Sequence, residues 1–288
     1  MTSALNIQNV QKTLGEFSLT DISFTLPQGY IMGLIGANGA GKSTTLKMII
    51  NLIKPDSGDI LVYGDSVLEK TVETKQKIGF VFDESHFYEH LNIDTMKKII
   101  APFYDEWDEE AFNMYINRFK LPTKQKIKTF SKGMKMQLNI TLALSHHAKL
   151  IIMDEPTAGL DPIIRRDVLH VLQEVVSTED VSVLFSTHVT TDLENIADYI
   201  TYIKDGRILF SDEKHKLESA YVLVKGDDKL LDAEARNLFV GLEKNPYGFV
   251  GLSDQAEEAR FYFGSEVIFE TPSLEDIMYY TTKGKIYT

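Results

Sequence analysis

The sequence has no cysteine among its 288 residues. This absence excludes disulfide bonds, thiolate metal sites and cysteine nucleophiles, and it agrees with a reducing cytosol. Long apolar runs are also missing, since stretches such as 48–53 and 150–153 are far shorter than the roughly 20 residues needed to cross a bilayer. The first residues, MTSALNIQNVQKT, lack the charged-then-apolar pattern of a secretion signal. We therefore expect a chain that is soluble by itself.

Basic residues are few relative to acidic ones. The chain has 30 Lys and Arg residues against 42 Asp and Glu residues, which gives a net charge of −12. This balance is poorly suited to contacts with the phosphates of nucleic acids or with anionic lipids. We expect no nucleic-acid partner and no direct membrane insertion, so any membrane attachment goes through another protein. The 43 % of hydrophobic residues can supply a substantial core.

Strand and helix patterns alternate along most of the chain. The continuous apolar runs at 31–35 and 150–153 are typical of strands covered on both faces of a parallel sheet. After the first of them, a helix is indicated by the i, i+3, i+4, i+7 spacing of Leu46, Ile49, Ile50 and Ile53. Further strands are predicted at 60–63, 78–82 and 181–185, with two short strands within 7–24. This alternation predicts an α/β fold with helices on the faces of a parallel sheet.

Several helices are expected between these strands. Few turn signals interrupt 90–148, which favours a helical insert. Within it, 134–144 alternates apolar and polar residues as a strand would, but its length and its few β-branched residues favour a helix. Asp161 can cap another helix whose first residue is proline, and Thr191 with Glu194 forms the capping pattern of a third.

The character of the sequence changes after about residue 215. Short strands are predicted at 221–224 and 260–263, and a terminal helix at about 273–281. We predict a small α+β domain over 215–288, after a larger domain over 1–214 whose helical subdomain covers about 84–148.

A phosphate-binding loop is indicated at 36–43. The residues Gly-Ala-Asn-Gly-Ala-Gly-Lys-Ser match G-x-x-x-x-G-K-[ST] and stand between a predicted strand and a predicted helix. Glycines let successive N–H groups point at a phosphate, Lys42 would neutralise the β- and γ-phosphates, and Ser43 would offer its hydroxyl to Mg²⁺. The alternative is a glycine-rich turn with a surface lysine. We predict a site for ATP and Mg²⁺ formed by Gly36, Asn38, Gly39, Gly41, Lys42, Ser43 and Thr44.

Two adjacent acids follow the buried strand at 150–153. Ligands meet an open α/β sheet at the carboxyl ends of its strands, where Asp154 and Glu155 stand. Asp154 can hold Mg²⁺ through water, and Glu155 can orient and deprotonate the attacking water. The alternative is a pair of solvated acids at a strand end. We predict that Glu155 and Lys42 are catalytic.

Three further segments have distinctive sequences that matter for identifying the chain. They read Phe-Ser-Lys-Gly-Met at 130–134, Ala-Gly-Leu-Asp at 158–161 and Ser-Thr-His at 186–188. With the two segments above, they make the chain resemble the nucleotide-binding subunit of an ATP-binding cassette (ABC) transporter over about 7–212. The resemblance implies a P-loop NTPase cassette with a parallel core sheet, an antiparallel β subdomain and a helical subdomain.

The resemblance also implies roles for single residues and for partners. Ser131 and Gly133 would receive the γ-phosphate of a nucleotide held by a second subunit, Asp161 would cross the dimer interface, and His188 would contact the γ-phosphate as a catalytic residue. The implied partners are a transmembrane permease and a second ATPase subunit, either an identical copy or a paralogue. The chain would then lie at the cytoplasmic face of the cell membrane, held there through the permease.

The nucleotide site departs from the family pattern at two positions. After the segment Ile-Gly-Phe-Val at 78–81 the family usually has a glutamine, whereas this chain reads Phe-Asp-Glu at 82–84. Either Asp83 or Glu84 would take the place of the glutamine toward Mg²⁺ and the nucleotide. The aromatic residue that usually stacks on adenine aligns with Leu14, and the nearest ring is that of Phe17.

A third departure indicates the kind of transporter. Lys132 stands where the family more often has glycine, which resembles exporters of drugs, lantibiotics and small peptides. The second domain and the Phe-Asp-Glu segment at 82–84 also look like those of amphipathic-peptide exporters. Phe87 and Tyr88 would either pack in the core or form the docking surface of the permease.

We expect the ATP-hydrolysing motor of a bacterial ABC exporter. The alternative is a soluble ABC ATPase that acts on DNA or ribosomes. Repair proteins of that type carry a long coiled coil between the phosphate-binding loop and the signature loop, which corresponds to 130–134 in this chain. Here only about ninety residues separate Lys42 from Ser131. Translation factors generally carry two cassettes. A third hypothesis, a regulator that has lost hydrolysis, rests on Asp83 and is opposed by Glu155.

Overall fold

The protein is represented by a computed structural model that describes residues 2–83 and 87–284. Glu84 lies outside the described residues. The chain divides into two compact units, one formed by 1–189 and 199–211 and the other by 190–198 and 212–288. The second unit therefore takes in a short segment from the middle of the chain as well as the region that follows residue 212.

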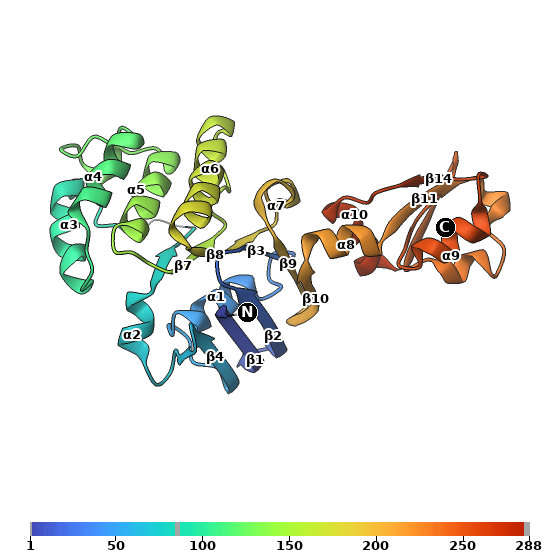
Figure 1. Ribbon diagram of the computed structural model, residues 1–288, viewed down its shortest axis with the longest axis horizontal. Coiled ribbons are helices and arrows are strands. Elements are labelled where there is room, and N and C mark those ends of the chain that lie inside the picture. Colours follow the sequence, from blue (N-terminus) through green and yellow to red (C-terminus); the bar gives the residue numbers. More distant parts are fainter. Residues whose placement is uncertain (1, 84–86, 285–288) are drawn as a thin grey trace. The chain divides into compact units, whose positions relative to one another are not determined.

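In the described residues, the first unit is built on a six-stranded sheet with the order β10-β9-β3-β8-β7-β6 (Figure 1). Five of these strands pair in parallel, so their carboxyl ends meet at one edge of the sheet. The structure confirms the strands predicted at 31–35, 78–82, 150–153 and 181–185. The bounds are β3 (Ile31–Ile35), β6 (Ile78–Val81), β7 (Leu150–Asp154), β8 (Ser182–Thr187), β9 (Tyr199–Lys204) and β10 (Arg207–Glu213).

A second, antiparallel sheet has the order β2-β1-β4-β5. It contains β1 (Ser3–Leu14), β2 (Phe17–Pro27), β4 (Ser57–Val62) and β5 (Asp65–Ser66). The two strands expected within 7–24 are longer than predicted, because their register shifts let the pairing continue past irregular points near Val10.

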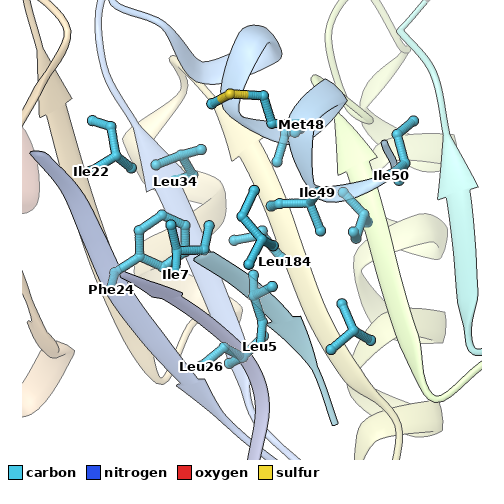
Figure 2. Packing of buried hydrophobic residues seen from close by; sticks show 14 of the residues in the cluster. Leu5, Ile7, Ile22, Phe24, Leu26, Leu34, Met48, Ile49, Ile50 and Leu184 are labelled. Carbon is cyan, nitrogen blue, oxygen red and sulfur yellow. The ribbon is translucent and has the colours of Figure 1, made fainter. Parts of the chain in front are cut away.

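The main core lies between the two sheets. In Figure 2, Leu5, Ile7 and Phe24 of the antiparallel sheet lie in the same cluster as Leu34 and Leu184 of the parallel sheet. All five side chains are almost fully buried. The helix predicted after the phosphate loop is α1 (Lys42–Ile49), which ends in this cluster. The burial of this apolar surface is the main contribution that stabilises the elements on either side of the phosphate loop.

The helical insert predicted over 90–148 is confirmed. Its helices are α3 (Ile93–Ile100), α4 (Glu109–Arg118) and α5 (Lys132–Leu144), with 3-10 turns at Ala101–Phe103 and Ile127–Thr129 (Figure 1). The helical interpretation of 134–144 is therefore correct. Asn92, Asp108 and Ser131 cap the three helices through their side-chain oxygens. Phe112, Ile116 and Leu138 belong to the apolar cluster that these helices share.

Three other helices adjoin the strands. α2 (Thr71–Gln76) precedes β6, and α6 (Pro162–Glu179) begins with proline and is capped by Asp161, as predicted. The third, α7 (Thr190–Ile196), lies in the second unit. It starts at Thr190, so Thr191 is inside the helix, and the prediction that Thr191 caps it was wrong.

The second unit contains an antiparallel sheet with the order β12-β13-β11-β14. Residues 260–263, predicted as a strand, are the end of helix α9, whose Ala259 and Phe263 are buried one turn apart. The terminal helix is confirmed, and Ser273 forms a capping box with Asp276. The elements are α8 (Lys214–Ala220), β11 (Val222–Gly226), β12 (Gly241–Asn245), β13 (Gly248–Ser253), α9 (Ala256–Phe263), β14 (Ile268–Glu270) and α10 (Leu274–Lys283), with 3-10 turns at Asp228–Leu230 and Ala235–Leu238.

Candidate nucleotide-binding site

The phosphate loop joins the end of β3 to the start of α1. Gly39 and Gly41 have φ values of 81° and 114°, in the left-handed region that side chains rarely adopt. A Cβ on Gly36 would lie 2.4 Å from the carbonyl oxygen of Ile203, so only glycine fits there. No side chain caps the N-terminus of α1, and its first amides remain available to an anion. Asn38 is exposed on this loop, whereas Ser43 and Thr44 are half-buried in α1.

The Lys42 side chain is buried inside the loop. Its Nζ donates to the carbonyl oxygen of Gly36 at 2.8 Å and to that of Ala37 at 3.4 Å. The same Nζ lies 3.4 Å from Oε1 of Glu155. The ammonium is thus fixed where the loop curls, with a carboxylate as its counter-charge. A phosphate entering the loop would meet a positive charge that is already oriented.

The two predicted acids lie at the end of β7, next to the end of β8. The parallel register pairs Asp154 with Ser186, and the Ser186 hydroxyl donates to Oδ1 of Asp154 at 2.6 Å. The N–H of Glu155 donates to the carbonyl oxygen of Ser186 at 3.0 Å. Glu155 adopts φ 48°, which turns the chain out of the strand. Ser186 was not predicted as a site residue, although its position at the end of the adjacent strand was a signal for it.

The Glu155 carboxylate links the phosphate loop to the switch segment, which we define as residues 186–188. Oε1 faces Lys42, and Oε2 lies 2.8 Å from Nδ1 of His188. Glu155 is 13 % exposed and His188 is 52 % exposed, so the imidazole lies at the mouth of the site. The structure therefore brings together the three residues predicted to be catalytic. A largely buried carboxylate held between two donors is placed to orient water beside a bound phosphate.

Asp154 and Ser43 suit Mg²⁺, which takes few protein ligands, better than a metal ion coordinated only by protein side chains. The part of the chain that the structure describes has no cluster of three or more His, Cys, Asp or Glu residues able to hold a metal. Mg²⁺ typically binds one or two carboxylates and completes its shell with water and phosphate oxygens. The Asp154 carboxylate and the Ser43 hydroxyl supply oxygen donors of that kind.

The other predicted site residues form a second group where α5 and α6 begin. Ser131 caps α5, accepting from the N–H of Met134 at 3.2 Å, and Asp161 caps α6. A Cβ on Gly133 would lie 2.5 Å from Cδ1 of Ile164, so glycine lets α5 approach α6 closely. Ser131 and Asp161 are exposed. The two polar residues of this group are thus open to solvent, whereas Gly133 is buried.

The last two predicted site residues, Asp83 and Phe17, have surroundings that differ from each other. Asp83 Oδ1 is 3.3 Å from Nζ of Lys132, the residue between Ser131 and Gly133, so Asp83 lies next to the second group. Phe17 lies beside the phosphate loop, and its Cζ would be 3.2 Å from a Cβ on Gly41. The ring is partly buried against the main core. Its stacking on adenine stays a prediction.

A groove lies where β6 meets the helical insert. His146 is stacked on Tyr104 with ring centroids 3.7 Å apart, and burial lowers the pKa of this imidazole. Phe87 packs against the core of the insert, whereas Tyr88 is 59 % exposed. The groove is lined by Phe80, Phe82, Phe87, Tyr88, Met96, Ile99, Ile100, Tyr104, Asn139, Leu142, Ala143 and His146.

Residues 19–158 match the protein family described as ABC transporter. The chain is 31 % identical to the ABC transporter ATP-binding protein YtrB of Bacillus subtilis, over 77 % of this chain and 76 % of that protein. It is 37 % identical to the linearmycin resistance ATP-binding protein LnrL of the same organism, over 71 % and 68 %. The lantibiotic transport ATP-binding protein SrtF of Streptococcus pyogenes is 32 % identical, over 73 % and 90 %.

Solved structures agree with these sequences. An ATP-binding subunit of an ABC transporter superposes with a TM-score of 0.70 at 26 % identity, over 75 % of this chain and 92 % of that chain. A dimeric ATP-binding cassette bound to ADP and Pi gives a TM-score of 0.65 at 22 % identity, over 73 % and 98 %, which shows the same fold. No helix within 2–83 and 87–284 has the length and apolar character to span a bilayer. The chain belongs to the ATP-binding proteins of ABC transporters, a family of ATP-hydrolysing subunits, as its motifs predicted.

Proposed function

We propose that this chain is the MgATP-hydrolysing motor of an exporter and acts on a separate transmembrane permease. One observation carries the proposal: the Glu155 carboxylate lies between Lys42 of the phosphate loop and His188 of the switch segment. This arrangement supplies a charge for the phosphates, an acceptor for a proton and a group that holds the acceptor in place.

The chemical step follows from these groups. A water oxygen attacks the γ-phosphorus, the bond to the β–γ bridging oxygen breaks, and ADP and phosphate leave. Glu155 orients the water and takes its proton, while His188 holds the carboxylate and Lys42 neutralises charge that builds up on the phosphates. Bound Mg²⁺ would supply further charge neutralisation at the phosphates, with Ser43 and Asp154 as its protein donors.

We infer that the working form is a dimer with two composite sites. Ser131, Gly133 and Asp161 form a group separate from the Glu155 site, and its two polar residues are exposed. A two-fold axis that pairs this surface with the phosphate loop of a second subunit would complete both sites. ATP then favours the closed dimer because its γ-phosphate contacts both subunits. Either an identical chain or a paralogue can serve as the second subunit.

The groove beside β6 is the proposed docking surface for the permease. Its aromatic lining is open to solvent at Tyr88, and Phe103 nearby is 72 % exposed. Exposed apolar side chains of this kind mark protein interfaces more often than isolated surface residues. Phe87 packs against the core of the helical insert, and Tyr88 is exposed at the rim of the groove. Docking here would hold the chain at the cytoplasmic face of the membrane.

Export is favoured by the relatives and by Lys132. The curated relatives include proteins named for bacitracin transport, lantibiotic transport and linearmycin resistance. We propose that this chain also powers export, and that the permease selects the cargo. The region after residue 214 is proposed as a separate domain of the same subunit.

Isolation from native membranes tests the proposal. The tagged chain is expected to co-purify with an integral membrane protein, and the complex is expected to hydrolyse MgATP faster than the isolated chain. The matched variant Tyr88→Ser should reduce co-purification while leaving ATP binding unchanged, because Tyr88 lies in the groove and outside the phosphate loop. Isolation without any integral membrane protein, together with no ATP hydrolysis, would overturn the proposal.

A further inference from the structure

The Lys132 side chain lies at the start of α5, close to the loops that follow β6 and β7. Its Nζ lies 3.3 Å from Oδ1 of Asp83, which follows β6. A Cβ built on Gly159, in the loop after β7, would lie 3.6 Å from the same nitrogen. Lys132 itself opens α5, next to Ser131. The ammonium of this first residue of α5 therefore pairs with the loop that follows β6 and lies near the loop that follows β7.

The pair between Lys132 and Asp83 is too exposed to matter much for folding. The side chains are 48 % and 44 % exposed, and ion pairs of this kind contribute little to stability in water. The consequence of the pair is therefore local. The pair places a positive charge beside Asp83, the residue that stands where the family usually has a neutral glutamine.

An uncompensated carboxylate at this position would oppose nucleotide binding. A triphosphate carries several negative charges, and a further carboxylate close to it raises the free energy of the bound state. Within the described residues, Asp83 has a cation beside it, and that cation comes from the signature loop. Aspartate is also one methylene shorter than glutamine, so its carboxylate reaches less far toward the phosphates.

We propose that Lys132 is a positioning residue that neutralises Asp83 and holds it against the signature loop, so that an acid is tolerated beside bound MgATP. This inference rests on the proposed function, since it takes the site to bind MgATP. It assigns the Lys132 charge to Asp83 and not to the phosphates themselves. The two unusual residues, Asp83 for glutamine and Lys132 for glycine, then compensate each other.

A double-mutant cycle in the full chain tests this assignment. The wild type, Lys132→Gln, Asp83→Asn and the double variant are compared by titration of MgATP binding and by kcat and KM of hydrolysis. Lys132→Gln is expected to raise the dissociation constant about three- to tenfold, with KM rising in step and kcat changing little. In the Asp83→Asn background the same substitution should change it less than about twofold. Raising the salt to about 0.5 M should shrink the defect of the single variant.

The pair between Lys124 and Asp94 is the matched control. It joins residues of the same types at 2.6 Å within the helical insert. Lys124→Gln should leave MgATP binding unchanged, both alone and combined with Asp94→Asn. An equal effect of Lys132→Gln with and without Asp83 would show that Lys132 binds phosphate directly and would overturn the inference, as would no effect in either background. Binding is measured separately from hydrolysis. A protein that binds MgATP without cleaving it would therefore contradict the proposed function, while its binding data would still test the pair between Lys132 and Asp83.

Discussion

Oε2 of Glu155 lies 2.8 Å from Nδ1 of His188 and 3.3 Å from the backbone nitrogen of His188. One carboxylate oxygen thus faces both the side chain and the main chain of the residue that follows β8. Oε1 is left to face Lys42 at 3.4 Å. The orientation of Glu155 is therefore set by contacts from two separate loops, and this orientation allows one oxygen to serve as a proton acceptor.

Replacing Glu155 with glutamine is expected to stop hydrolysis and preserve ATP binding. The amide keeps the shape of the side chain but is a very poor proton acceptor, so kcat should fall about 10²- to 10⁴-fold. With MgATP bound and not cleaved, the dimer should persist. Size-exclusion chromatography with MgATP should show a dimer that the wild type forms only transiently.

ADP provides the control for this variant. Since ADP lacks the γ-phosphate that would touch the second subunit, Glu155→Gln should elute as a monomer with MgADP. Monomeric elution at saturating MgATP would contradict the composite-site scheme. Dimers with both nucleotides would show that the γ-phosphate is not what holds the subunits together.

Replacing His188 with alanine should slow hydrolysis more than it weakens binding. The substitution removes the 2.8 Å contact to Glu155, while the Lys42 contact remains. A carboxylate that can rotate away from the water costs about 10- to 100-fold in rate. Steady-state kinetics should show this loss in kcat with little change in KM. A rise in KM alone would assign His188 to ATP binding instead.

Lys42→Ala is expected to weaken ATP binding about 10- to 100-fold, through the loss of charge-assisted hydrogen bonds to phosphate. Lys47→Ala is the matched control, because Lys47 lies on the same helix and is exposed. Calorimetric titration with MgATP should separate the two variants. Thermal melts of both show whether the chain still folds, since Lys42→Ala also leaves Glu155 without one of its partners. An unchanged dissociation constant for Lys42→Ala would refute its role at the phosphates.

The sequence predicted the local parts of the site because their signals are local. Gly39 and Gly41 do adopt the left-handed conformations that a phosphate loop requires, and Asp161 does cap the helix that follows it. Each of these features is determined by a few adjacent residues. The strand at 150–153 was found for the same reason, since its run of apolar residues fits a strand buried on both faces.

The contacts between distant residues could not be read in the same way. Ser186 meets Asp154 because β7 and β8 pair in a register that no local pattern specifies. Lys132 meets Asp83 because α5 starts next to the loop after β6. Both contacts depend on how separate elements are packed. The sequence motifs predicted which residues would bind the nucleotide, but they did not predict the hydrogen bonds that orient these residues.

The error at 260–263 has a different origin. Three aromatic residues in a run of four favoured a strand, whereas the four-residue spacing of the buried Ala259 and Phe263 and the acids in the first turn are typical of a helix. The helical spacing becomes visible only over a segment longer than these four residues.

The Asp65 carboxylate should make the stability of the fold depend on pH. Hydrogen bonds from Lys70 and Lys77 lower the pKa of Asp65 to about 2, from an ordinary value of 3.8. A carboxyl with a depressed folded-state pKa stabilises the fold above pH 3.8 and loses that contribution as the pH falls toward 2. Asp65→Asn should therefore lower the thermal midpoint near neutral pH, and its difference from the wild type should narrow as the pH falls below about 4. In a Lys70→Gln, Lys77→Gln background the same substitution should have little effect at any pH. A difference between wild type and Asp65→Asn that stays constant down to acid pH would show that these lysines do not stabilise the Asp65 carboxylate.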